Sequence, residues 1–153
     1  MWLFPFAKKK PFFSDAENAQ IVAAIREAEQ QTCGEIRVFV ESRCRFVDPV
    51  DRAIEIFTGL KMEQTLHRNG VIVYIAIKDR QLAVFGDSGI HAKTGEEYWK
   101  MEVARMISLF NQHDYVAGIC NCVREIGQAL HEYFPYDSTE DKNELPDEIV
   151  FGK

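Results

Sequence analysis

The stretch that decides the fold is Gly70-Val-Ile-Val-Tyr-Ile-Ala-Ile-Lys-Asp-Arg-Gln-Leu-Ala-Val-Phe-Gly-Asp-Ser-Gly-Ile90. Residues 71–77 are apolar without alternation, which is typical of a strand covered on both faces in the middle of a sheet. The charged residues 78–80 predict a turn, and residues 82–85 predict a strand that returns antiparallel to the first. This hairpin therefore predicts a sheet with helices on both faces.

Helix and strand patterns also precede the hairpin. A capping-box pattern at residues 14–17 begins a helix that is expected to stop at Gly34. Apolar and polar residues then alternate over residues 36–41, which predicts a strand with one more polar face. The Asp-Pro pair at residues 48–49 predicts a second helix, which is expected to end just before Asn69 and Gly70. A helix between two strands predicts that they are parallel, with a right-handed crossover.

Two further helical patterns follow the hairpin. One begins near residues 95–97, where two acids suit the positive end of a helix dipole. The other begins at Asp114 and ends at Pro135, and residues 149–151 can add a short edge strand. The predicted order is α-β-α-β-β-α-α. The predicted fold class is α/β, a three-layer αβα sandwich with a mixed sheet of three to four strands.

The length of 153 residues suits one well-buried core and is too short for two. We expect an N-terminal arm at residues 1–13, a single domain at residues 14–136 and an acidic tail at residues 137–153. The arm carries three lysines and no acid, whereas the tail carries six acidic and two basic residues. The net charge is −6 and no basic face emerges, which argues against nucleic-acid binding.

No stretch approaches the roughly 20 apolar residues that span a bilayer. The apolar residues of the arm precede its lysines, which is the reverse of a signal peptide, and we expect no membrane contact from it. The four cysteines have no zinc-finger spacing, so they are expected to pack as reduced thiols. We therefore expect a cytoplasmic, monomeric protein.

Carboxylates from distant parts of the chain are expected to gather at one edge of the sheet. Glu35 stands at the beginning of the first strand, and Asp87 follows the end of the antiparallel third strand. Glu96 and Glu97 come a few residues later at a helix start. Because carboxylate and carbonyl oxygens are the ligands of Ca²⁺ or Mg²⁺, these four acids are the candidate metal ligands.

An ordinary structural interpretation of the same acids remains open. Asp87 can be a turn residue that binds its own backbone, and Glu96 and Glu97 can be first-turn acids that favour a helix dipole. The sequence assigns no residue a catalytic role.

The segment Gly86-Asp87-Ser88-Gly89 imitates two hydrolase motifs. Trypsin-like proteases need a Gly-Pro after it, whereas Ile90 follows here, and their two β-barrels need a longer chain. The nucleophile elbow of α/β-hydrolases has the spacing Gly-x-Ser-x-Gly between a strand and a helix, which this segment does not have. We therefore do not interpret Ser88 as a nucleophile.

Several short motifs occur in a fixed order within residues 14–136. They are Gly34 to Val38, Asn69 to Tyr74, Phe85 to Ile90, Asp114 to Gly118 and Tyr133 to Pro135. Together they resemble the TPM domain family, named for thylakoid-lumen, photosystem-repair and receptor-modulator members, in its short stand-alone bacterial form.

The resemblance implies an αβα sandwich, binding of a divalent cation, Ca²⁺ in particular, and an acid phosphatase activity known in plant luminal members. Many longer members carry a Glu in the turn and a Thr-Asp-Ala segment after it. This chain has His91 and Glu96 near those places.

Two functional hypotheses follow. The first is a TPM-type domain that binds a cation through Glu35, Asp87 and Glu96 or Glu97, and that, if it is an enzyme, hydrolyses phosphomonoesters with the help of the metal. The second is an interaction module without chemistry, in which the aromatic arm and the acidic tail contact a partner protein or a membrane surface.

Overall fold

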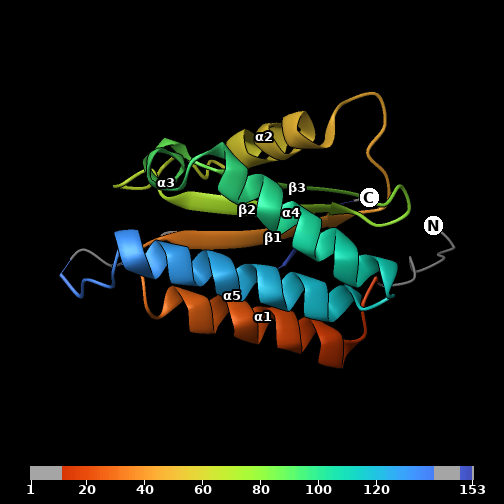
Figure 1. Cartoon of the computed structure of the whole chain (residues 1–153), viewed down its shortest axis with the longest axis horizontal. Coiled ribbons are helices and arrows are strands. Elements are labelled where there is room, and N and C mark those ends of the chain that lie inside the picture. The colour runs from red at the N-terminus through yellow and green to blue at the C-terminus, as the bar shows by residue number, and fades with distance from the viewer. Residues whose placement is uncertain (1–11, 140–148, 153) are drawn as a thin grey trace, which may run out of the picture.

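The computed structural model describes residues 12–139 and 149–152 (Figure 1). The arm up to residue 11 and most of the acidic tail lie outside the described residues. The interaction hypothesis rests on these two segments, so it also falls outside what the structure describes. The elements are α1 (Asp15–Glu29), β1 (Glu35–Glu41), α2 (Pro49–Gly59), β2 (Gly70–Ala76), β3 (Gln81–Gly86), α3 (Ser88–Thr94), α4 (Glu96–Asn111), α5 (Tyr115–Tyr133) and β4 (Val150–Phe151).

The four strands form one mixed sheet in the order β3-β2-β1-β4. Strands β1 and β2 are parallel, with Glu35 opposite Gly70 and Glu41 opposite Ala76. Strand β3 pairs antiparallel with β2, and the two-residue β4 pairs parallel with β1. The predicted α/β class, the mixed sheet and the order of the main elements are confirmed.

Helices cover both faces of the sheet (Figure 1). Helices α1, α4 and α5 pack on one face around a core that includes Val38, Val73 and Ile126. Helix α2 packs on the other face, where Phe57 meets a smaller core that includes Tyr74. Every residue of β2 is buried, as the uninterrupted apolar pattern of this strand predicts.

Local signals set most of the helix starts. Ser14 accepts a hydrogen bond from the Glu17 N–H, and the Glu17 carboxylate accepts one from the Ser14 N–H, which completes the capping box of α1. Asp48 caps α2 through the Val50 N–H at 3.0 Å, with proline in the first helical position.

Helix α2 ends earlier than predicted, at Gly59 rather than just before Asn69. Residues 60–69 instead form a loop whose inner side includes Met62, which is fully buried. Lys61 and Arg68 have positive φ angles of 59° and 51°, which a continuous helix does not allow. Met62 therefore packs against the sheet from a loop rather than from a helical turn, whereas Leu66 of the same loop is exposed.

Helix α3 occupies a segment for which the sequence predicts only a turn. Asp87 caps it by accepting a hydrogen bond from the Ser88 N–H at 2.7 Å, and its own carbonyl accepts one from His91. The sequence signal is weak because α3 has only seven residues and contains a glycine, which lowers helix propensity.

The four cysteines are free and buried, in agreement with the expected reduced thiols. In the described part of the chain, no helix combines the length and the apolar character that a membrane span requires.

Candidate functional site

The amino ends of β1 and β2 and the carboxyl end of β3 lie at one edge of the sheet. The Glu35 N–H donates to the Asn69 carbonyl at 3.4 Å, and the Asp87 N–H donates to the Gly70 carbonyl at 2.9 Å. The backbones of Glu35 and Asp87 are therefore both bonded to the same two-residue segment at the entrance of β2. We call this region the amino edge.

Asp87 is the most strongly engaged acid of the amino edge. Its two carboxylate oxygens accept hydrogen bonds from Nε and NH2 of Arg68 at 2.6 and 2.8 Å. The Asp87 side chain is 4% exposed, whereas the Arg68 side chain is 52% exposed. The hydrogen bonds from the guanidinium to Asp87, and then the charge of that carboxylate, raise the pKa of Arg68. A buried carboxylate is thus balanced by a cation that water reaches.

A close backbone contact positions Arg68. The Gly89 N–H in α3 donates to the Arg68 carbonyl at 2.8 Å. A Cβ atom at Gly89 would stand 2.0 Å from the His67 carbonyl oxygen and 2.7 Å from that of Arg68. Only glycine allows the loop before β2 to approach α3 this closely, so Gly89 sets the place from which Arg68 reaches Asp87.

Glu35 and Asn69 are also polar residues buried at the amino edge, with exposures of 2% and 1%. The Asn69 amide nitrogen lies 3.5 Å from the Cys33 sulfur. The Asn69 Oδ1 atom is buried and accepts no hydrogen bond from the described residues. An amide oxygen in this state remains able to accept a donor or to bind a cation.

Glu96 and Glu97 lie on the first turn of α4 and point to solvent. Their side chains are 75% and 89% exposed and pair with Lys100 at 3.9 and 3.6 Å. Among the described residues, no group of three His, Cys, Asp or Glu side chains is arranged to hold a metal ion. The oxygen donors of the amino edge are of the type that Ca²⁺ or Mg²⁺ binds, and in the structure the cation paired with Asp87 is the guanidinium of Arg68.

An open hollow of about 680 Å³ adjoins the amino edge. Cys33, His67 and Lys93 line one side of it, and residues 133–138 line the other. His67 and Lys93 bring basic groups to this hollow, next to the segment that carries Arg68 and Asn69. The size and the basic groups suit a small anionic molecule.

The serine of the hydrolase-like segment lies at the start of a helix. Ser88 is the first residue of α3, and its N–H is bonded to Asp87. His91 instead accepts a hydrogen bond at Nδ1 from the Trp99 indole at 3.0 Å. This arrangement agrees with the interpretation of Ser88 as a structural residue.

The opposite edge of the sheet holds a closed ion-pair network. Arg52 donates to both oxygens of the buried Glu41 at 2.9 and 3.0 Å, and the Tyr74 hydroxyl also donates to Glu41. Burial acts to raise the pKa of Glu41, but the hydrogen bonds from Arg52 and Tyr74 outweigh it and lower that pKa. This network joins β1, β2 and α2 and leaves Glu41 fully occupied.

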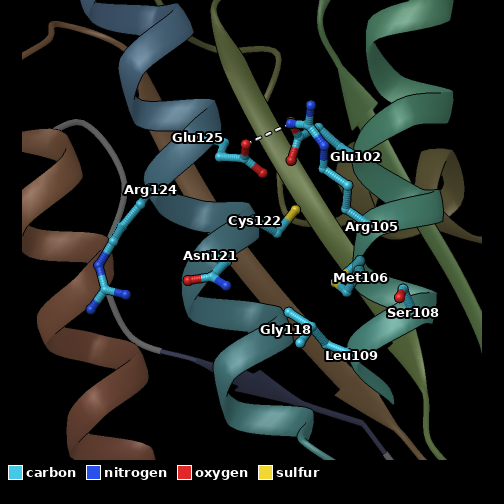
Figure 2. Close-up of a pocket in the computed structure, with 10 residues that line it drawn as sticks. All are labelled: Glu102, Arg105, Met106, Ser108, Leu109, Gly118, Asn121, Cys122, Arg124 and Glu125. Carbon is cyan, nitrogen blue, oxygen red and sulfur yellow. Dashed lines mark hydrogen bonds and ion pairs between the residues drawn. The ribbon is translucent and has the colours of Figure 1, made fainter. Parts of the chain in front are cut away.

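A second cavity lies between α4 and α5 (Figure 2). Glu102 stands in its wall with a side-chain exposure of 1%, and Arg105 bridges it to Glu125 on α5. Sequence reasoning missed Glu102, although a signal was present. Residue 102 falls three after Trp99 and four before Met106, on the buried stripe of the helix.

The comparisons with known proteins identify a family and a shared fold. The TPM domain profile matches residues 8–129. The solved structure of the BA42 protein from the psychrophilic bacterium Bizionia argentinensis is 36% identical, with a TM-score of 0.85, over 95% of this chain and 99% of that one. Among curated proteins, none matches the chain.

Two more distant structures share the fold. The N-terminal domain of the cg2496 protein from Corynebacterium glutamicum is 16% identical, with a TM-score of 0.61, over 81% of this chain and 86% of that one. The N-terminal domain of a protein from P. gingivalis is also 16% identical, with a TM-score of 0.65, over 82% of each chain.

Proposed function

Because the chain belongs to the TPM domain family, we propose that it binds a divalent cation, Ca²⁺ or Mg²⁺, at the amino edge of the sheet. The proposal rests on one observation: a buried carboxylate, Asp87, is balanced by the half-exposed guanidinium of Arg68. Burial disfavours an unpaired carboxylate, so Asp87 requires a cation. Arg68 supplies that cation from a flexible side chain that an incoming ion can displace.

Oxygen donors around Asp87 support this proposal. Glu35 and the Asn69 amide oxygen lie at the same edge, and the backbone there contributes the carbonyls of Asn69 and Gly70. Carboxylate, amide and carbonyl oxygens together form the type of ligand set that Ca²⁺ accepts in irregular geometry. We also propose Glu96 and Glu97 as outer ligands of the cation. To bind it, their carboxylates would have to leave their ion pairs with Lys100.

Hydrolysis of a phosphomonoester is the proposed reaction if the protein is an enzyme. When bound, a divalent cation supplies polarisation of a phosphoryl oxygen. Lys93, which lines the adjoining hollow together with His67, would attract the phosphate by charge. Arg68, once displaced from Asp87, would be free to donate hydrogen bonds to the same phosphate.

A titration followed by NMR tests the cation site. Ca²⁺ and Mg²⁺ are added separately to the wild-type protein and to Asp87→Asn, which keeps an oxygen for the Ser88 N–H but loses the charge. We expect wild-type shifts centred on residues 34–35 and 86–89, and we expect them to be absent in Asp87→Asn. A double variant, Glu96→Gln with Glu97→Gln, measures the contribution of the two exposed acids.

The proposal is wrong if millimolar Ca²⁺ and Mg²⁺ shift no signal at the amino edge, or if Asp87→Asn binds as tightly as the wild type. The reaction is tested separately, by release of phosphate from 4-nitrophenyl phosphate with and without the cation. Phosphatase activity that is the same in Asp87→Asn as in the wild type would contradict a reaction at the amino edge. It would not decide whether the cation binds, because the titration tests that separately.

A further inference from the structure

We propose that the cavity between α4 and α5 binds a small organic ammonium ion, a primary alkylamine, through the carboxylates of Glu102 and Glu125 (Figure 2). This site is separate from the amino edge and does not depend on the function proposed there.

Glu102 is the residue that points to a ligand. Its side chain is 1% exposed, and its two carboxylate oxygens accept no well-formed hydrogen bond from an N–H or O–H group of the described residues, although the weak donor Cys122 lies beside them. Its ion pair with NH1 of Arg105 is 3.5 Å long, whereas the same nitrogen lies 2.5 Å from Glu125. Arg105 therefore forms its closer ion pair with Glu125, and the buried carboxylate of Glu102 can accept further hydrogen bonds.

The local charges leave one negative charge in excess. Two carboxylates, Glu102 and Glu125, share the guanidinium of Arg105, while Arg124, which also borders the cavity, points away from it toward Glu27 of α1 at 3.9 Å (Figure 2). The Tyr98 hydroxyl donates to a backbone carbonyl, and Cys122 is a buried thiol.

The other elements packed against α4 place no positive charge at the cavity to balance this excess negative charge. Strand β3 contains no charged residue. In α3, the ring of His91 is bonded to Trp99, and Lys93 lines the hollow beside the amino edge instead of this cavity. Burial, and then the charge of Glu125, raise the pKa of Glu102 to about 7. A proton therefore balances the excess charge below neutral pH, and above it a bound cation can take the place of the proton.

The cavity suits an alkylammonium better than a bare ion. It has a volume of about 480 Å³, and Met106, Leu109 and Gly118 add apolar groups to a lining that also contains the two glutamates. An ammonium group has three donors to share between carboxylate oxygens, and its alkyl chain can cover the apolar groups. Arg105 and Glu125, with side-chain exposures of 51% and 36%, stand where the cavity meets solvent.

Butylammonium is the probe that tests this proposal, with 1-butanol as the neutral control. We expect butylammonium to shift amide signals of α4 and α5 around the cavity at pH 8. Binding is expected to be about tenfold weaker at pH 6, because a proton then occupies Glu102 in most molecules. Glu102→Gln is expected to lose the binding, while Glu132→Gln, an exposed change on α5, is expected to keep it.

Several outcomes would overturn the proposal. They are an absence of shifts at 100-fold excess of butylammonium, equal shifts with 1-butanol, or unchanged binding by Glu102→Gln. Displacement of butylammonium by millimolar Ca²⁺ at the same amides would also overturn it, in favour of a metal site. Glu125→Gln provides a second variant, which removes the partly exposed carboxylate and must also weaken binding if the pair holds the ammonium.

Discussion

Gly89 is the residue at which the loop before β2 meets helix α3. Replacing it with alanine would place a methyl group 2.0 Å from the His67 carbonyl oxygen, so the loop must move away from α3. We expect Gly89→Ala to lower the free energy of unfolding by about 1–3 kcal/mol, measured by urea denaturation. Gly59→Ala is the matched control, because a Cβ there meets no atom within 4 Å. A Gly89→Ala protein as stable as the Gly59→Ala protein would contradict the close approach.

Glu102 is expected to make the stability depend on pH. Its pKa rises from the ordinary 4.5 to about 7 on folding, so the folded protein holds this proton more tightly than the unfolded chain. The destabilisation by this group therefore grows as the pH rises from about 4.5 to 7 and is constant above that range.

Glu102→Gln removes this dependence and keeps the size of the side chain. We expect the variant to exceed the wild type in free energy of unfolding at pH 8 by roughly 1–3 kcal/mol, and to match it near pH 4. Urea denaturation of both proteins at the two pH values measures the difference. A difference that does not change with pH would contradict an ionisable Glu102 in the core.

At the scale of the elements, α5 contributes most to the core on its face of the sheet. Ile126 in its middle is fully buried, whereas Ile107 on α4 is 41% exposed. We expect Ile126→Ala to lower the free energy of unfolding by about 2–4 kcal/mol and Ile107→Ala to change it by about 0.5 kcal/mol or less. Thermal or urea denaturation measures both, and equal losses would mean that α5 is not packed as described.

The sequence predicts elements best where one local signal is strong. The apolar run of β2, the charged turn after it and the Asp-Pro start of α2 all occur as predicted. Helix α3 and the early end of α2 were not predicted, because both depend on the docking of the loop at residues 60–69. That docking is a long-range contact, which no local pattern records.

The candidate site also has one feature that the sequence predicts and another that it does not. The common edge of Glu35 and Asp87 follows from strand direction alone, so the sequence predicts it. The ion pair of Asp87 with Arg68 requires the left-handed backbone of Arg68 and the close contact of Gly89, neither of which a sequence pattern records. Whether Glu35, Asp87, Glu96 and Glu97 bind a cation stays a prediction.

At the scale of the whole molecule, the sheet is most protected at its centre. Strand β2 has a hydrogen-bonded neighbour on each side and a helix layer on each face, whereas β4 is a two-residue edge strand. We expect the β2 amides to exchange hydrogen most slowly, only through global unfolding, and the amides around β4 to exchange much faster. Hydrogen exchange followed by NMR measures this order. Early exchange of β2 would contradict a sheet covered on both faces.

The most direct test of cation binding at the amino edge is the Ca²⁺ affinity of Arg68→Gln relative to the wild type, measured by NMR titration at low ionic strength. If Arg68 occupies the cation position at Asp87, its removal abolishes the competition, and the variant must bind Ca²⁺ several-fold more tightly. Arg43→Gln is the matched control, since Arg43 pairs with Asp79 at 2.9 Å with a similar exposure but lies outside the site. Equal or weaker binding of Ca²⁺ by Arg68→Gln would contradict the account.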